Sequence, residues 1–398
     1  MKLYTKVSTS LTGSSVPLEG FLVLSMAKFD HIIEVSPEDR YAVVEAGVRL
    51  DALNDHLSKY GFFYPPDPGS SIAATVGGSI STNAGGMKAV AYGTTRNWVL
   101  GLEVVLPNGE IIKVGGKVLK RTAGYDLTSL FIGAEGTLGV ITKAILKIWP
   151  LPEARGRILA YYDEIGKIGE AVSSINARGI TPEMAEFMDR ITMDSLTRTR
   201  GMRFPESAKY MLLVDIATTS ESLQRQLSET VEILKESKPV DIHVTTDPSE
   251  MARMYEARKG SYASLLSERD KPSERVVIGD IVVPPSELPE ALREIEAKIG
   301  EYGLKVALFG HVADGNIHAN IYADVDDRDF MNKVERFQIE LGKIAIRHEG
   351  SVSAEHGIGL EKKGLLKLEL SPQVLELMKS IKKAIDPNNI MNRGKVFD

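Results

Sequence analysis

The sequence of 398 residues contains no cysteine. This absence excludes disulfide bonds, thiolate zinc sites, cysteine nucleophiles and ordinary iron–sulfur clusters. Any redox chemistry in this protein therefore requires a bound organic cofactor, or a metal held by residues other than cysteine.

The sequence also lacks an excess of positive charge and any long apolar run. Its formal net charge is -6, so a nucleic-acid partner has little electrostatic support. The most apolar stretches, such as 20–26 and 99–106, are much shorter than the roughly 20 residues that span a bilayer. No signal peptide or transit sequence is recognisable. We expect a cytoplasmic protein without a transmembrane segment, and docking at a membrane surface stays open.

The remaining composition is that of a globular protein with two or three domains, because 43% of the residues are hydrophobic and 26% are charged. Residues 20–150 are rich in glycine and in short β-type runs, whereas later segments show longer helical periodicity. This change predicts a domain boundary between Pro150 and Glu153.

Local patterns predict the main elements on both sides of this boundary. Leu50, Leu53 and Leu57 share one helical face, and an Asn-Gly pair at 108–109 predicts a hairpin between two strands. Further strands are expected at 140–148, 210–216 and 276–283, and further helices at 223–234, 292–299 and 330–348. The second part is therefore expected to be an α+β sheet with helices on one face.

Two glycine-rich loops, at 65–86 and 133–139, suit a dinucleotide. Glycines let the backbone approach a ligand closely, and their amides can point at pyrophosphate oxygens, while Thr75 and Asn83 can add side-chain hydrogen bonds. Alternatively, these glycines simply form turns in a β-rich domain. Two such loops in one domain shift the balance towards a cofactor.

Three of the seven histidines lie in two short motifs, at 310–318 and 353–359. The Asp-Gly turn signal at 314–315 predicts that His311 and His318 lie on neighbouring strands with converging imidazoles, and Glu355 would join them from a distant segment. Two imidazoles and one carboxylate suit zinc, manganese or ferrous iron and leave coordination positions open. The alternative is that these are ordinary core or surface histidines.

From Gly13 onwards, the chain resembles the FAD-linked oxidases of the vanillyl-alcohol oxidase superfamily, in the branch of D-lactate dehydrogenase, the glycolate oxidase flavin subunit and D-2-hydroxyglutarate dehydrogenase. The motifs that carry this resemblance are PPDP, TVGGSISTNAGG, YGTTRNWVLGLEVVLPNGE, AGYDLTSLFIGAEGTLGVIT, GHVADGNIHANI, SAEHGIG and DPNNIMNRGK. It implies an α+β fold with an FAD-binding, PCMH-type domain at 1–152, a cap domain carrying substrate at 153–350, and a final segment, 351–398, that returns to the flavin.

The resemblance further implies which residues bind FAD and which act on the substrate. The residues implied at the FAD are Pro66, Asp67, Thr75, Gly77, Gly78, Asn83, Gly85, Gly86, Gly136, Thr137, Gly139, Ile141 and Asn389, with Asn392 near the flavin ring. The implied metal ligands are His311, His318 and Glu355, the implied substrate contacts are Arg258, Asn320 and His356, and His356 is also the catalytic base.

The implied reaction is the metal-assisted oxidation of a small D-2-hydroxy acid, D-lactate or glycolate, to the 2-oxo acid, with hydride transfer to flavin N5. Relatives that act on longer diacids carry a lysine near the position of Ile278. The absence of this lysine favours a small substrate. The electrons are expected to pass to an acceptor other than NAD, and a homodimer stays open.

The N-terminus departs from the family pattern. A first αβ unit is missing, so we expect an N-terminally truncated flavin domain, and the cofactor loop reads Thr5–Thr9 with the β-branched Val7 where a glycine is usual. The rival hypothesis is therefore an inactive fragment or non-catalytic subunit that no longer binds FAD. A weaker third hypothesis is another flavin reaction on the same scaffold, such as that of a lipid-precursor synthase.

Overall fold

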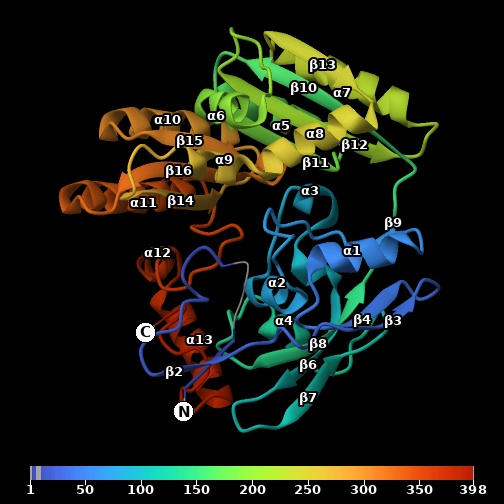
Figure 1. Cartoon of the computed structure of the whole chain (residues 1–398), viewed down its shortest axis with the longest axis vertical. Coiled ribbons are helices and arrows are strands. Elements are labelled where there is room, and N and C mark those ends of the chain that lie inside the picture. The colour runs from blue at the N-terminus through green and yellow to red at the C-terminus, as the bar shows by residue number, and fades with distance from the viewer. Residues whose placement is uncertain (1, 6–9, 398) are drawn as a thin grey trace. The chain divides into compact units, whose positions relative to one another are not determined.

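The computed structural model describes residues 2–5 and 10–397, and the chain divides into two compact units (Figure 1). Unit 1 consists of Met1–Gly86, Tyr92–Leu151 and Glu355–Asp398, and unit 2 of Met87–Ala91 and Pro152–Ala354. The predicted cofactor loop at Thr5–Thr9 lies almost entirely outside the described residues. No helix of the described part is long and apolar enough to cross a membrane.

Unit 1 is built on a five-stranded antiparallel sheet in the order β3-β4-β8-β6-β7. The strands are β3 (Ile32–Ser36), β4 (Tyr41–Glu45), β8 (Val140–Lys147), β6 (Val99–Val105) and β7 (Ile111–Gly115). The predicted hairpin is confirmed, since β6 and β7 pair around a turn in which Gly109 has φ 88. Two further two-stranded sheets pair β1 (Lys2–Thr5) with β2 (Phe21–Leu24), and β5 (Phe62–Phe63) with β9 (Trp149–Pro150).

The core of unit 1 lies between this sheet and its helices. The predicted helix is α1 (Leu50–Ser58), and all three leucines of its predicted apolar face are buried in that core. The other helical segments of unit 1 are α2 (Val76–Thr82), η1 (Thr95–Trp98), α4 (Leu127–Phe131), α12 (Lys363–Glu369) and α13 (Pro372–Ile385), whereas the short α3 (Ala89–Tyr92) lies mostly in unit 2. Burial of the leucine face explains why α1 forms where the sequence predicts it.

Unit 2 contains a seven-stranded antiparallel sheet in the order β13-β10-β12-β11-β15-β16-β14. Its strands are β13 (Asp241–Thr245), β10 (Ala154–Tyr162), β12 (Tyr210–Thr218), β11 (Met184–Asp189), β15 (Val306–Gly310), β16 (Asn316–Asp324) and β14 (Glu274–Val282). Its helices are α5 (Gly166–Ala177), α6 (Arg190–Arg200), α7 (Leu223–Glu236), α8 (Pro248–Lys259), α9 (Ser261–Ser267), α10 (Leu288–Tyr302) and α11 (Arg328–Arg347), with the short η2 (Val312–Asp314).

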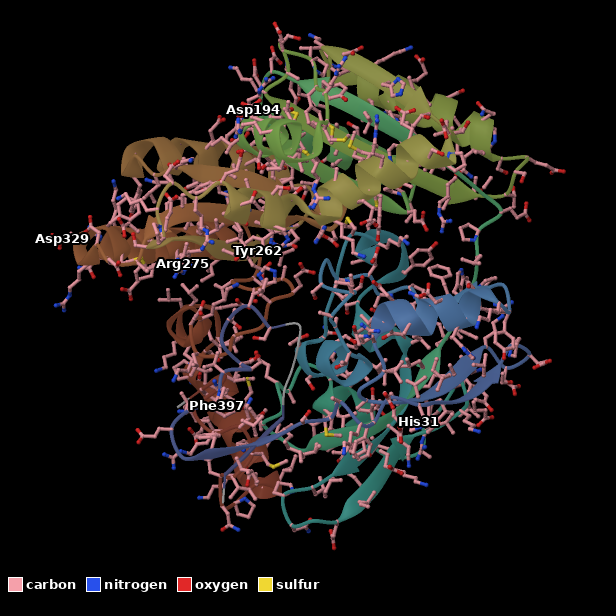
Figure 2. The ribbon with its side chains drawn as sticks, in the orientation of Figure 1. His31, Asp194, Tyr262, Arg275, Asp329 and Phe397 are labelled. Carbon is pink, nitrogen blue, oxygen red and sulfur yellow. The ribbon has the colours of Figure 1, made fainter. Side chains whose placement is uncertain are left out.

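Helices cover both faces of this sheet, so the prediction of helices on one face only was wrong. One core cluster packs strand residues such as Phe187 against α5, α7, α10 and α11. A second cluster packs strand residues such as Met188 against α6, α8 and α9. Figure 2 labels Tyr262, on α9, whose hydroxyl donates to Val276 O of β14 at 3.3 Å. None of the helices on this second face was predicted from the sequence, and α8 carries little apolar periodicity.

Strand alternation decides which side chains face α6, α8 and α9. In β11, Ala185 and Phe187 belong to the first cluster and Met184 and Met188 to the second. Because successive side chains point to opposite faces, Glu186 lies on the second face. By the same alternation Asp280, His318 and Asn320 share that face, since Ile281, Ile317, Ala319 and Ile321 belong to the first cluster.

Candidate active site

The two motif histidines of unit 2 lie next to each other. His318 is in β16, opposite Phe309 of β15, and His311 directly follows β15. Their ring centroids are 5.1 Å apart with the rings nearly perpendicular, and both residues are buried. Gly315 makes the connection possible, because it has φ 87 and a Cβ built there would lie 1.8 Å from Val283 O. The local turn therefore brings the two imidazoles together.

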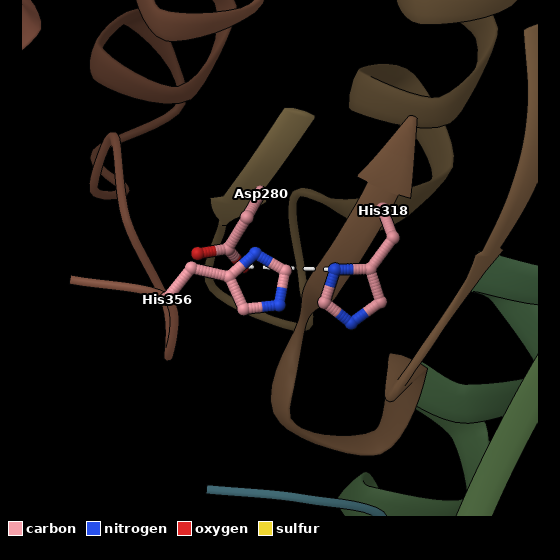
Figure 3. A group of neighbouring side chains, drawn as sticks. All are labelled: Asp280, His318 and His356. Atoms are coloured by element: carbon pink, nitrogen blue, oxygen red, sulfur yellow. Dashed lines mark ion pairs between the residues drawn. The ribbon is translucent and has the colours of Figure 1, made fainter. Parts of the chain in front are cut away.

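A buried carboxylate lies behind each imidazole. Glu186 Oε1 lies 2.7 Å from His311 Nδ1, and Asp280 Oδ1 forms an ion pair with His318 Nδ1 at 3.7 Å (Figure 3). Asp280 and His318 are direct cross-strand partners. The sequence analysis missed both carboxylates, although each is an acidic residue within a largely apolar strand, and such a residue must find a partner when it is buried.

Arg258 lies in the last turn of α8 and is buried, with 4% of its surface exposed. Its Nη2 lies 2.5 Å from Glu186 Oε2, and its guanidinium carbon lies 4.5 Å from the centre of the Phe309 ring. The ion pair is close, but its angles do not make a hydrogen bond, so Nε and Nη2 have no hydrogen-bond acceptor within the described residues. A buried guanidinium with unused donors is suited to an anionic ligand.

Asn320 is fully buried on the same strand and face as His318. Its Nδ2 donates to Ala307 O at 3.1 Å, whereas its Oδ1 has no hydrogen-bond partner in the described part of the chain. Ile278 is its cross-strand partner and is partly buried. Unit 2 thus places unused donors and an unused acceptor on one face, together with the two histidines.

The segment that carries Glu355 and His356 begins where unit 2 ends. Asp280 Oδ2 accepts hydrogen bonds from Ser353 Oγ at 3.1 Å and from Ala354 N at 3.2 Å. These hydrogen bonds hold Ala354, the residue before Glu355, at Asp280, whose carboxylate also pairs with His318. A single peptide bond then leads to Glu355, the first residue of the final segment of unit 1.

Within unit 1, the backbone around His356 is held on both sides. His356 O accepts from Thr12 Oγ1 at 3.0 Å, and the amides of Ile358 and Gly359 donate to the Glu135 carboxylate at 2.7 and 2.9 Å. Glu135 is buried, and burial raises the pKa of its carboxyl although these amides oppose the shift. The glycine-rich loop at 133–139 thus holds the histidine motif.

All residues predicted to bind FAD lie in unit 1. Thr75 caps α2 by accepting from Gly78 N at 3.2 Å, and Asn83 ends α2 with φ 52. Asn83 Oδ1 accepts from Thr94 Oγ1 at 3.0 Å and Arg96 N at 2.9 Å. Both side-chain oxygens thus stabilise their own loops, and their predicted contact with FAD stays a prediction.

Several of the predicted cofactor glycines are required by packing against protein atoms. A Cβ at Gly77 would lie 2.8 Å from Ala46 Cβ, and one at Gly86 would lie 2.0 Å from Asp67 O. A Cβ at Gly139 would similarly meet Val104, at 2.6 Å. Packing within unit 1 therefore requires glycine at these three positions, and their predicted contact with FAD stays a prediction. A Cβ at Gly85 would instead lie 3.1 Å from the Glu355 carboxylate, which puts Glu355 beside this loop.

The other predicted FAD residues lie around the same loops. Pro66 is buried, Gly136 has φ 72, and Ile141 is buried in β8. Thr137 and Asn389 line one cavity of about 440 Å³, which also includes Asn392. Asn392 Nδ2 donates to Glu135 O at 2.6 Å, so this asparagine attaches the C-terminal tail to the 133–139 loop.

A second group of possible metal ligands lies in unit 1 and consists of Asp30, His31 and Glu45. His31, labelled in Figure 2, has its Nδ1 2.8 Å from Glu45 Oε2. The side chains of His31 and Asp30 are, however, 75% and 64% exposed. Water competes with such exposed ligands, so we assign no site here.

Comparison with known families identifies both parts of the chain. A family described as "FAD linked oxidases, C-terminal domain" matches residues 151–396, and one described as "FAD binding domain" matches residues 7–115. The glycolate oxidase subunit GlcD of Bacillus subtilis (strain 168) is 38% identical over 390 residues, which are 98% of this chain and 82% of that protein. A probable mitochondrial D-lactate dehydrogenase of Danio rerio is 34% identical, over 98% of this chain and 78% of that protein.

Solved structures show the same fold at lower sequence identity. A p-cresol methylhydroxylase with substrate bound has a TM-score of 0.79 and 18% identity, with all of this chain and 84% of that chain covered. An alkyldihydroxyacetonephosphate synthase has a TM-score of 0.74 and 15% identity, with 98% and 71% covered. The predicted combination of an FAD-binding domain and an oxidase cap domain is confirmed.

Proposed function

The chain belongs to the FAD-linked oxidases, and on this basis we propose that it oxidises a small D-2-hydroxy acid, D-lactate or glycolate, to the 2-oxo acid. One observation carries the proposal: a buried arginine, Arg258, has unused donors beside the pair formed by His311 and His318. The names of the relatives, glycolate oxidase subunit and D-lactate dehydrogenase, agree with this substrate class.

Substrate recognition is assigned to unit 2. Arg258 can pair with the substrate carboxylate through two parallel N–H groups. Asn320 Oδ1 is a buried acceptor that a substrate hydroxyl can satisfy. Ile278, the cross-strand partner of Asn320, offers an apolar contact and no charge for a second carboxylate. This arrangement supports a short monocarboxylate.

We assign a divalent metal, zinc, manganese or ferrous iron, to His311, His318 and Glu355. The donor set fits, because the two imidazoles are 5.1 Å apart and His311 has a hydrogen-bonded carboxylate partner of the kind that orients metal-bound histidines. His318 forms an ion pair with Asp280 at 3.7 Å. Asp280 also anchors the chain at the residue before Glu355. When bound, such a metal orients the substrate and lowers the pKa of its hydroxyl.

One polar atom in the loops of unit 1 is available for FAD. Ser71 Oγ, shortly after the PPDP stretch, is buried and has no hydrogen-bond partner within the described residues. Bound FAD supplies the acceptor for the hydride that leaves the substrate carbon. His356 takes the hydroxyl proton, so that loss of a hydride and a proton converts the alcohol to a ketone or aldehyde. The two electrons then pass to an acceptor other than NAD.

The experiment is an absorption spectrum of the protein purified with FAD and mixed anaerobically with D-lactate or glycolate. We expect oxidised flavin bands that bleach with one of these acids and not with L-lactate. When the carboxylate and the hydroxyl are held in the same places, the α-hydrogen of L-lactate points away from the flavin. A protein that binds FAD but keeps its bands with both acids would refute the proposed substrate class. A protein that binds no FAD would support the rival hypothesis of a non-catalytic chain.

A further inference from the structure

We infer that Glu186 is a positioning residue that links the metal half of the unit 2 site to its carboxylate-binding half. Its Oε1 lies 2.7 Å from His311 Nδ1, and its Oε2 lies 2.5 Å from Arg258 Nη2. The inference rests on the proposed function, in which His311 binds a metal and Arg258 binds the substrate carboxylate.

The position of Glu186 in the fold explains why it can bridge these two residues. It is fully buried in β11, between Ala185 and Phe187 of an apolar strand. β11 pairs with β15, and Phe187 is aligned with Gly310, the residue before His311. A carboxylate without solvent is tolerated only when it is paired, and here each oxygen has a partner on a different element.

The contact with His311 orients the imidazole. A carboxylate accepts a hydrogen bond, so Nδ1 must carry the proton in this contact. The ring then presents Nε2 as its coordinating nitrogen. Loss of this acceptor would permit the other tautomer and other ring orientations. We therefore expect Glu186 to increase metal affinity without touching the metal.

The contact with Arg258 orients the guanidinium. Its orientation is restricted by the ion pair with Glu186 and by the Phe309 ring, whose centre lies 4.5 Å from the guanidinium carbon. The single N–H donor at Nε remains without an acceptor in the part of the chain that the structure describes. The same carboxylate thus sets the directions from which Arg258 can bind a substrate carboxylate, so one residue influences both metal affinity and KM.

The test compares Glu186→Gln with a matched control, Glu183→Gln. Glu183 lies three positions earlier, is also buried, and pairs with Arg155 through both oxygens at 2.7 and 2.9 Å. Both substitutions remove a buried charge from an arginine, but only Glu186 contacts a histidine in the site. An amide cannot present an acceptor oxygen to both His311 and Arg258.

The first readout is metal affinity, measured by calorimetric titration of metal-stripped, FAD-loaded protein with Mn²⁺ and Zn²⁺. We expect Glu186→Gln to weaken binding about tenfold or more and Glu183→Gln to leave it unchanged. The second readout is steady-state kinetics with the hydroxy acid, in which Glu186→Gln should raise KM more than it lowers kcat. Glu186→Asp, which keeps the charge at a shorter reach, should lose less metal affinity than Glu186→Gln.

Equal effects of the two glutamine substitutions, or wild-type metal affinity in Glu186→Gln, would overturn the inference. If Glu186→Gln does not fold, wild-type metal affinity in Glu186→Asp overturns it instead. Failure of the proposed function gives a different result, in which the wild-type protein binds metal but its flavin is not reduced by the hydroxy acid. In that case the metal titration still decides the role of Glu186. A wild type that binds no metal overturns this inference together with the metal assignment, whereas the bleaching experiment still decides the proposed oxidation.

Discussion

At the scale of single residues, His356 is held in place by contacts of the backbone around it. Its carbonyl is held by Thr12, and Gly357, with φ 77, packs so tightly that a Cβ would lie 2.8 Å from Glu135 Oε1. The next two amides are also fixed on Glu135. Replacing the imidazole should therefore leave the loop in place, which makes this residue suitable for a functional test.

We predict that His356→Asn reduces the rate of flavin reduction by a factor of about 10² to 10⁴, the usual effect of removing a general base. FAD and metal content should remain at the wild-type level. Stopped-flow measurement of flavin bleaching, together with elemental analysis, checks both parts. An unchanged reduction rate would show that another group takes the proton.

At the scale of elements, two buried lysines attach the C-terminal tail to the rest of unit 1. Lys382, in α13, donates to Thr137 O at 2.7 Å and Met391 O at 2.9 Å and forms an ion pair with Asp386. Lys395 donates to Gly13 O and Val16 O, both at 2.6 Å. Burial lowers the pKa of both lysines. These contacts explain how a segment nearly 400 residues from the N-terminus completes the first domain.

We predict that Lys382→Met lowers the free energy of unfolding by about 3 kcal/mol, because it leaves the carboxylate of Asp386 buried without its counter-charge. Urea denaturation followed by circular dichroism measures the change. Lys383→Met is the matched control: this neighbouring side chain is exposed, and its loss should change the free energy by less than about 0.5 kcal/mol. Similar values for the two variants would mean that the tail is not held by Lys382.

At the scale of the whole molecule, the predicted chemistry divides between the two units. The predicted FAD residues all belong to unit 1, whereas Arg258, His311, His318 and Asn320 all belong to unit 2. Glu355 and His356 follow the point where the chain leaves unit 2. Loss of the metal should therefore affect the substrate step without releasing the flavin.

We predict that a chelator which strips the divalent metal leaves FAD bound but slows flavin reduction by about a hundredfold or more, since a Lewis acid contributes several kcal/mol to such a step. Adding back Zn²⁺ or Mn²⁺ should restore the rate. Flavin absorbance after gel filtration and the rate of bleaching are the two measurements. Release of FAD together with the metal, or an unchanged rate, would contradict this division.

The sequence by itself determined the features that depend on local periodicity and short turns. The face of Leu50, Leu53 and Leu57 predicted α1, because helix side chains repeat every 3.6 residues, and Asn108-Gly109 predicted the β6–β7 hairpin. The motifs were sufficient to identify the family, which the comparisons confirm. In each case the information lies within a few consecutive residues.

Only the tertiary structure decided which buried carboxylates contact the histidines of the site. Glu186 meets His311 across 125 positions of the chain, and this contact depends on the pairing of β11 with β15, which no local pattern specifies. Likewise, Asp280 faces His318 only through the register of β14 with β16. The structure also shows that the oxygens of Thr75 and Asn83 accept hydrogen bonds from the protein's own loops. Strand order and register are set by packing of the whole sheet, so a residue whose function depends on them is not recognisable from its neighbours in sequence.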